Sequence, residues 1–350
     1  MNILRALPRL LALAALVGGG LGAQPAAGTA VDPFDQIKQM RRGVNIIGYD
    51  PIWRNFESAR FKERHFQRIQ AGGFQTVRIN LQAFSHMDAA NRLNPAWFTT
   101  LDWAVKNALA NNLTVILDEH DYGICGNDAE GCKPRLMAFW EQVAEHYKDA
   151  PPSVLFELLN EPNGKLTPEL WNAWLKEALA TVRKTNPKRN VVIGPASWNN
   201  IHYLDRLELP PDDRNIVVTV HYYLPMEFTH QGARWNAATA NLSGIAWGTD
   251  AEKRRVDEDF GGVQQWSKAQ KRPNPSAGRG PTGSSTRTLS STIWLGTIGF
   301  SPSGKRWSRK GDQPRRRACV TRARSRIRSK TSPMRAGLCE RVRYSRRPPP

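Results

Sequence analysis

Polar side chains stand at the ends of several short apolar runs in this sequence. They are Arg78, His120, Asn160, Glu161, Trp198, His221 and Tyr223. Together they offer a carboxylic acid, a fixed cation, imidazoles, an amide, a phenol and a flat indole ring. This set of groups suits chemistry on sugars, in which a carboxyl group protonates a glycosidic oxygen, polar groups bind hydroxyls and aromatic faces stack on pyranose rings.

The apolar runs before these side chains are short and rich in Val, Ile and Leu, as expected for parallel strands that are buried on both faces. The predicted strands span residues 43–49, 74–81, 114–120, 154–161, 191–195 and 216–223. Catalytic groups of a (β/α) barrel lie at the C-terminal ends of its strands, so the polar residues would meet on one surface. His221 and Tyr223 are two residues apart and share a face of their strand.

Amphipathic helices are predicted between the strands. One begins at Asn94 and Pro95 and another at Thr167 and Pro168, because each pair places a capping side chain before a proline at the first helical position. Two more helices are expected over residues 134–148 and 251–271. The alternation predicts an α/β fold, a (β/α)8 TIM barrel with about six recognisable units, or alternatively an open doubly wound sheet. No glycine-rich phosphate loop follows the first strand, which disfavours nucleotide binding.

The two ends of the chain differ from its middle. Residues 1–23 resemble a signal peptide, with Arg5 and Arg9 before an apolar stretch and small residues before Gln24. We expect residues 24–40 to be a linker, residues 41–273 to form the barrel, and residues 274–350 to be a disordered basic tail. The expected product is secreted or periplasmic, without a membrane segment after cleavage.

The net charge of +19 is concentrated in that tail. Residues 274–350 hold 19 lysines and arginines against 2 acids, whereas residues 1–273 hold 31 against 29. The body is therefore nearly neutral, which argues against nucleic-acid binding by the folded part. Binding of an anionic partner through the tail remains the alternative, and strongly salt-dependent affinity would identify it.

Cysteines are few. Cys125 and Cys132 lie in a glycine-containing segment and could form a disulfide in an exported protein, two free thiols being the alternative. Cys319 and Cys339 fall in the tail. No Cys/His cluster has the spacing of metal ligands, and we expect neither a metal nor a cofactor.

Taken in strand order, these motifs resemble glycoside hydrolase family 5, also known as cellulase family A. The match consists of Arg78 on the second strand, His120 on the third, the Asn160-Glu161-Pro162 motif on the fourth, and His221 with Tyr223 on the sixth. Residues 228–235, which include His230, are similar to endoglucanases of the family. The resemblance covers roughly residues 40–273 and implies a β-1,4-glucan substrate, with mannan or xylan as the alternative.

The resemblance also implies roles. Glu161 would be the acid/base of a retaining mechanism, and Asn160 would bind the 2-hydroxyl of the sugar. Tyr223, Arg78 and His221 would orient the nucleophile. Such a role requires the pKa of Glu161 to be raised, which a neighbouring carboxylate can supply.

Other interpretations of these residues remain open at this stage. Arg78 could be a structural ion-pair partner of Glu157, which also points inward by strand parity. His120 could be a core histidine with satisfied hydrogen bonds. Trp198 and His230 could contact substrate or merely pack their loops.

The expected nucleophile, a Glu at the end of a seventh strand, is missing from the pattern. Beyond residue 273 the only Glu is Glu340, and arginine, serine and proline replace the apolar periodicity. We interpret this change as a frameshift near residue 273. If the tail is real as written, the chain should hydrolyse little. The sequence thus predicts a monomer that acts on a polysaccharide, or a carbohydrate-binding pseudoenzyme.

Overall fold

The computed structural model describes residues 30–275. By its contacts the chain divides into two compact units, Met1–Gly299 and Phe300–Pro350, and everything below concerns the first. The expected signal peptide and nearly all of the basic tail lie outside the described residues.

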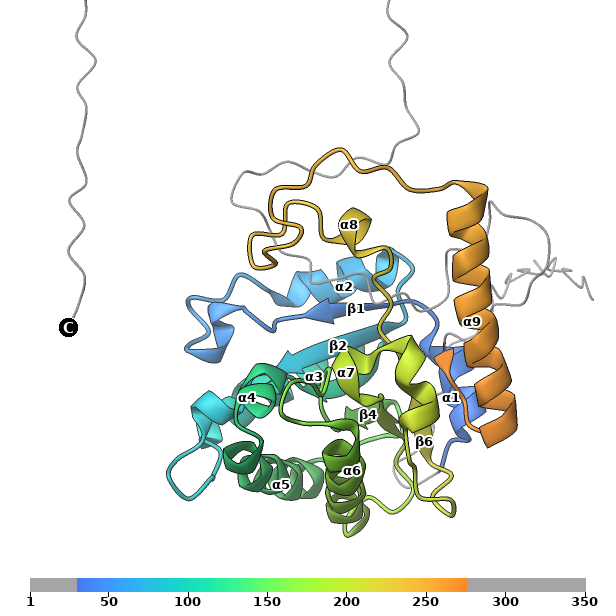
Figure 1. Ribbon diagram of the computed structural model, residues 1–350. Helices are drawn as coiled ribbons and strands as arrows, with labels where there is room; N and C mark the ends of the chain where they lie inside the picture. The colour runs from blue at the N-terminus through green and yellow to red at the C-terminus, as the bar shows by residue number, and fades with distance from the viewer. Residues whose placement is uncertain (1–29, 276–350) are drawn as a thin grey trace, which may run out of the picture. The chain divides into compact units, whose positions relative to one another are not determined.

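A parallel sheet of six strands forms the centre of this unit (Figure 1). The strands are β1 (Gly43–Ile46), β2 (Thr76–Leu81), β3 (Thr114–Glu119), β4 (Val154–Glu157), β5 (Val191–Ile193) and β6 (Ile216–Val218). Each pairs with the next along the chain. This consecutive order matches six successive units of a (β/α) barrel and rules out the doubly wound alternative, in which the strand order reverses.

All strands except β2 end earlier than predicted at their C-terminal sides, by up to five residues in β6. Arg78 lies within β2 as expected, and the other polar residues expected inside the strands occupy the connections that follow them. They remain at the same end of the sheet, where parallel strands deliver their outgoing chains.

Helices follow the strands. They are α1 (Pro33–Met40), α2 (Glu63–Ala71), α3 (Pro95–Ala110), α4 (Tyr122–Asn127), α5 (Ala129–His146), α6 (Pro168–Arg183), α7 (Ala196–Asn199), α8 (Met226–Thr229) and α9 (Asp250–Gln270), with 3-10 turns η1 (Pro51–Trp53), η2 (Phe84–His86) and η3 (Ile201–Arg206). Helices α5 and α6 run side by side on the outside of the strands (Figure 1). In residues 30–275, no helix has both the length and the apolar character needed to cross a membrane.

Two further boundaries differ from the sequence-based expectation. Helix α5 begins at Ala129, five residues before the expected start at Pro134, because the Asp128 carboxylate accepts a hydrogen bond from the Gly131 amide and caps the helix there. The expected linker 24–40 contains α1, whose first turn is capped by Asp32.

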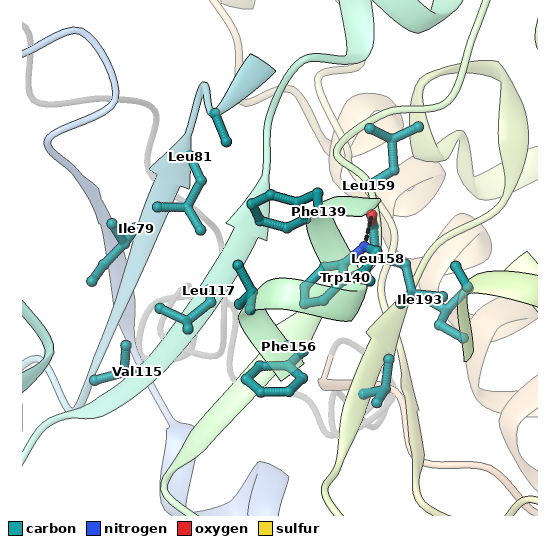
Figure 2. Close-up of a cluster of buried hydrophobic side chains, with 14 of the residues drawn as sticks. Ile79, Leu81, Val115, Leu117, Phe139, Trp140, Phe156, Leu158, Leu159 and Ile193 are labelled. Carbon is teal, nitrogen blue, oxygen red and sulfur yellow. Dashed lines mark hydrogen bonds between the residues drawn. The ribbon is translucent and has the colours of Figure 1, made fainter. Parts of the chain in front are cut away.

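Apolar side chains pack on both faces of the sheet. The larger cluster lies between the sheet and the outer helices and includes Phe139, Trp140 and Phe156 (Figure 2). The buried indole of Trp140 donates from Nε1 to the carbonyl oxygen of Leu158 at 2.9 Å, so this N–H group is paired inside the cluster.

A smaller cluster fills the inner face. Ile116, Leu155, Val192 and Val217 from β3 to β6 meet Met40 at the end of α1. Helix α1 thus closes the N-terminal end of the strands. The opposite end of the same face carries the polar residues.

The chain returns to the sheet after α9. The β6 amide of Val218 donates to the carbonyl oxygen of Pro273 at 2.9 Å, and Arg272 and Asn274 are buried. This is the place where a seventh parallel strand would begin, and the described residues end at 275.

Candidate active site

Arg78 is the centre of a buried polar network on the inner face. Its Nε lies 2.6 Å from Glu157 Oε2 and its Nη2 lies 2.8 Å from Glu157 Oε1. Nη2 also donates to Asn160 Oδ1 at 2.9 Å and lies 2.9 Å from Asp118 Oδ1. The ion pair with Glu157 therefore exists, and the same guanidinium also fixes a residue of the Asn-Glu-Pro motif.

Strand register explains this meeting. Arg78 pairs with Ile116, and Asn80, Asp118 and Glu157 occupy the next level up across three neighbouring strands. Burial lowers the pKa of Arg78, but the charges of Asp118 and Glu157 outweigh it and raise that pKa above its usual range. The guanidinium stays charged and can act as a permanent anchor.

His120 is bound to this network. Its Nδ1 lies 2.6 Å from Asp118 Oδ2, and the Asn80 amide donates to the same carboxylate oxygen at 3.0 Å. The ring is partly exposed and stands edge-on to Tyr122, with ring centres 5.3 Å apart. His120 is therefore hydrogen-bonded, as a core histidine would be, and it also lines the cavity described below.

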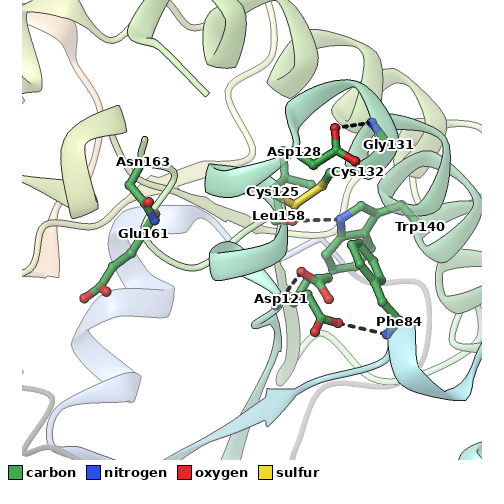
Figure 3. Close-up of a disulfide and its surroundings, with 11 residues drawn as sticks. Phe84, Asp121, Cys125, Asp128, Gly131, Cys132, Trp140, Leu158, Glu161 and Asn163 are labelled. Carbon is green, nitrogen blue, oxygen red and sulfur yellow. Dashed lines mark hydrogen bonds between the residues drawn. A yellow bond between two sulfur atoms is a disulfide. The ribbon is translucent and has the colours of Figure 1, made fainter. Parts of the chain in front are cut away.

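Glu161 has a strained backbone. Its φ of 45° lies in the left-handed region although a proline follows it, a conformation that costs energy and is concentrated at functional sites. The side-chain amide of Asn163 donates from Nδ2 to the carbonyl oxygen of Glu161 at 2.7 Å. Figure 3 shows the Glu161 carboxylate pointing away from Trp140 and from the disulfide. The side chain is 15% exposed.

His221 is the hydrogen-bond partner of this carboxylate, with 2.6 Å between its Nδ1 and Glu161 Oε1. Burial raises the pKa of Glu161, but the hydrogen bond and charge of His221, with the charges of Arg78 and His120, outweigh burial and lower it. The sequence-based expectation of a raised pKa is thus wrong for the described residues. They place Arg78, His120 and His221 around Glu161, where a second carboxylate was expected.

Trp198 lies on a left-handed turn. Ser197, Trp198 and Asn199 have φ values of 60°, 63° and 54°. The Trp198 amide donates to the carbonyl oxygen of Pro162 at 3.1 Å, which ties this turn to the Asn-Glu-Pro motif. Its indole is 54% exposed, so loop packing alone does not account for it.

A row of aromatic rings extends outward from His221. The ring of Tyr223 stands edge-on to that of His221, with 6.5 Å between the ring centres. The ring centres of Tyr223 and His230 are 5.1 Å apart, and those of His230 and Trp235 are 5.0 Å apart. Trp235 is 76% exposed. His230 packs within this row. Exposed aromatic faces that continue from a carboxylate suit the binding of successive sugar rings.

Two cavities adjoin the site. One, of about 390 Å³, is lined by His120, Tyr122 and Ile124 among others, and a larger one, of about 610 Å³, lies beside η1. Tyr49 and Gln82 line both. Burial raises the pKa of Tyr122 to about 12, so this phenol stays protonated at neutral pH. The two cavities share Tyr49 and Gln82 and together extend from the connection after β3 to the connection after β1.

A disulfide joins Cys125 to Cys132 and links α4 to α5 (Figure 3). Both cysteines are buried. The bond therefore pins the segment that carries Tyr122 into the cleft.

Sequence reasoning missed several members of the site. Asp118, Asn199, Tyr49 and Tyr122 were not predicted as site residues. For Asp118 the signal was available, because it lies two residues before His120 and so shares a face of the third predicted strand with it. Tyr49 and Tyr122 lie on irregular connections, where spacing carries no such information. Within residues 30–275, no group of three or more potential ligands is placed to hold a metal ion.

Comparison with known proteins adds the family. A cellulase (glycosyl hydrolase family 5) domain matches residues 37–274. The chain belongs to this family. Endoglucanase H of Acetivibrio thermocellus is 31% identical over 245 residues, which are 68% of this chain and 25% of that protein. Endoglucanase 3 of Fibrobacter succinogenes is 28% identical, over 67% of this chain and 39% of that protein. The family 5 chain thus spans less than half the length of these curated relatives.

Solved structures agree on the fold. Cel5A of Thermotoga maritima, in its complex with cellobiose, is 38% identical, with a TM-score of 0.66 over 69% of this chain and 80% of that one. The cellulose synthase subunit Z of Clostridioides difficile is 32% identical, with a TM-score of 0.63 over 67% and 79%. The six strands of the described residues therefore correspond to part of the (β/α)8 barrel of family 5.

Proposed function

We propose that this chain has the site of a retaining endo-β-glycosidase that cleaves β-1,4-linked glucan, with Glu161 as the acid/base. One observation carries the proposal. The Glu161 carboxylate is hydrogen-bonded by His221, and it interacts electrostatically with Tyr122, which lines the smaller cavity, and with Tyr223 of the aromatic row. A cleft that is open along its length suits attack within a polymer chain.

Asn160 has a defined orientation in this scheme. Its Oδ1 accepts a hydrogen bond from Arg78, which leaves its Nδ2 to donate to a sugar hydroxyl next to the cleaved bond. Glu161 would protonate the departing oxygen and later remove a proton from water. Tyr223 and His221 would line the reacting sugar.

The retaining mechanism also needs a second carboxylate about 5–5.5 Å from the first. Among residues 30–275, Asp118 and Glu157 are the carboxylates beside Arg78, and both are fully buried, so neither is placed to attack a sugar. Beyond residue 275 the sequence offers Asp312 and Glu340 alone. We propose that the chain as sequenced binds glucan but lacks an effective nucleophile.

Binding and turnover test the two parts separately. The purified 350-residue chain should bind cellohexaose in calorimetry, and Trp235→Ala should weaken binding roughly ten-fold, equivalent to about 1.4 kcal/mol. Phe34→Ala, an exposed aromatic on α1 at the opposite end of the strands, serves as the control. Absence of cellohexaose binding would overturn the glucan proposal. Rapid hydrolysis of carboxymethylcellulose would overturn only the proposal of a missing nucleophile.

Azide provides a sharper test of the missing group. With an aryl β-cellobioside, azide should form a bond to C1 as the C1–oxygen bond breaks, and Glu161 should give its proton to the departing oxygen. The product is an α-glycosyl azide, so azide should accelerate release of the phenol. Turnover that azide leaves unchanged, with the β-configured sugar as product, would show that a nucleophile is present.

Two alternatives have support from specific observations. Cel5A of Thermotoga maritima has also been solved in complex with mannotriose, so mannan is a candidate substrate besides xylan. A carbohydrate-binding pseudoenzyme would show the same cleft without turnover. Calorimetry with mannohexaose and xylohexaose, beside cellohexaose, separates these glycans.

We also propose that the protein is exported after cleavage near residue 23 and acts as a monomer. The Cys125–Cys132 disulfide supports an oxidising compartment. N-terminal sequencing of the product from a secreting host tests the cleavage. Light scattering tests the monomer.

A further inference from the structure

His221 contacts a different side chain with each ring nitrogen. Nδ1 faces Glu161 Oε1 at 2.6 Å, and Nε2 faces the amide nitrogen Nδ2 of Asn199 at 3.4 Å. An amide nitrogen can only donate a hydrogen bond, so Nε2 has to accept and carries no hydrogen in the neutral ring. The remaining hydrogen then belongs to Nδ1, which donates it to the Glu161 carboxylate.

The position of Asn199 is fixed by its backbone and by its packing. The residue is fully buried and has a φ of 54°, a left-handed conformation that Asn tolerates better than most residues. Its carbonyl oxygen accepts from the His221 amide at 2.9 Å. Its side chain rests on Gly194, where a Cβ would lie only 2.4 Å from Asn199 Oδ1. Gly194 therefore makes room for this amide.

The amide oxygen of Asn199 is buried without a hydrogen-bond partner among the described residues. Such an orphaned acceptor costs roughly 1–3 kcal/mol. A fold that needed only a residue with this left-handed backbone could use glycine, which would bury no unpaired side-chain oxygen. The observation indicates that the amide is kept for its contact with His221.

We propose that Asn199 is a positioning residue that keeps the hydrogen of neutral His221 on Nδ1 and so makes this histidine the donor to Glu161. The inference rests on the proposed role of Glu161. With the hydrogen on Nε2, a bare Nδ1 would face the carboxylate oxygen and the hydrogen bond would be lost. Asn199 thus favours the ionised Glu161 that the water-activating half of the reaction requires.

Nitrogen NMR of the full-length protein labelled with ¹⁵N-histidine tests this directly. At pH 8, the His221 signals, assigned by their absence in His221→Gln, should show a protonated Nδ1 and a bare Nε2. Asn199→Asp places only acceptor oxygens at Nε2, so that nitrogen should become protonated. Asn199→Gly keeps the left-handed backbone and removes the amide, and it should also increase the protonated fraction of Nε2.

Asn186→Asp is the matched control, because Asn186 is another buried amide that contacts no histidine. It should leave the His221 signals unchanged, while thermal melting reports whether each variant folds. A protonated Nε2 in the unmodified protein would overturn the proposal, as would unchanged His221 signals in folded Asn199→Asp. The NMR result does not depend on turnover. A chain that fails to bind glucan but shows this tautomer would refute the proposed function alone.

Discussion

At the scale of single residues, one guanidinium fixes the positions of several acceptor groups around the site. Arg78 contacts Glu157, Asp118 and Asn160 at distances of 2.6–2.9 Å. Because these acceptors come from different strands and from the connection after β4, the arginine cross-links the inner face. Its loss would leave buried carboxylates without their partner.

Arg78→Lys should therefore destabilise the fold strongly. A lysine offers a point charge and cannot make the two parallel contacts with Glu157, so we expect a loss of about 3–5 kcal/mol in urea denaturation. Arg92→Lys, in an exposed pair with Asp88, is the control and should change little. Equal effects of the two substitutions would contradict the central role of Arg78.

A second residue-scale prediction concerns Glu119, which is fully buried at the end of β3. One of its oxygens accepts a hydrogen bond from the Asp121 amide at 3.0 Å. Burial, reinforced by the charge of Asp121, raises the pKa of Glu119 well above its ordinary value of 4.5. The folded protein thus holds a proton that the unfolded chain releases above about pH 4.5.

Stability should consequently fall as pH rises from about 4.5 through the raised pKa of Glu119, because the unfolded state binds fewer protons over that window. Glu119→Gln removes this titration and should make the stability curve shallower there. Urea denaturation at a series of pH values measures the slope. Glu130→Gln, an exposed acid on α5, should leave the slope as it was. An unchanged slope in Glu119→Gln would refute the assignment.

Residue types at strand ends were predictable, whereas their partners mostly were not. Spacing placed Arg78, Asn160, Glu161 and His221 at one end of the sheet, where the structure brings them together. The tautomer of His221 depends on Asn199, whose φ of 54° lies in the left-handed region. Backbone propensities of the local sequence do not predict a left-handed conformation at a particular non-glycine residue.

At the scale of elements, the α4–α5 segment depends on its disulfide to hold Tyr122 over the cleft. Cys125 and Cys132 are separated by 7 positions. A closed loop of about this size is stabilised by roughly 2.5 kcal/mol in the chain-entropy account.

Replacing both Cys125 and Cys132 by alanine should lower the free energy of unfolding by about 2 kcal/mol, in line with this account. Oxidised protein in urea gives the measurement. The double replacement of Cys319 and Cys339 by alanine is the control and should have no comparable effect. Equal stability of the Cys125/Cys132 variant and the unmodified protein would show that the bond constrains nothing.

Helix starts were predicted well where a cap and a proline coincide. The side chains of Asn94 and Thr167 accept amide hydrogens at the starts of α3 and α6, as expected. Pro134 misled the prediction for α5, because proline favours the first turn of a helix but here lies within the second turn, at the loss of one backbone hydrogen bond. The cap of α1 at Asp32 was visible in the sequence but lay in a segment too short to show clear periodicity.

At the scale of the molecule, the sheet has two open edges within the described residues. β1 and β6 each have one neighbouring strand, while the chain at Pro273 has just reached β6. The sequence changes character at that same position. A frameshift there accounts for both facts, and translation of the source DNA in its other frames tests the idea. A strand ending in Glu should appear in one of them.

Hydrogen exchange can show whether the barrel closes in the chain as sequenced. Amides of β3 and β4, which have neighbours on both sides, should exchange slowest, and those of β1 should exchange much faster. Mass spectrometry of peptides from the full-length protein gives the comparison. Equal protection of β1 and β3 would mean that residues beyond 275 complete the sheet.

Helix α1 also limits how far the N-terminus can be trimmed. Met40 packs against Ile116, Leu155, Val192 and Val217, and Asp32 caps the helix that carries it. A cut before Val31 would keep this packing and the hydrogen bond of 3.0 Å that the Val31 carbonyl oxygen accepts from Asn190 Nδ2. A cut a few residues later would remove the cap of α1, loosen Met40 and admit water to the inner face of the sheet beneath Arg78. The maturation site and the charge network at the other end of the sheet are thus linked through one methionine.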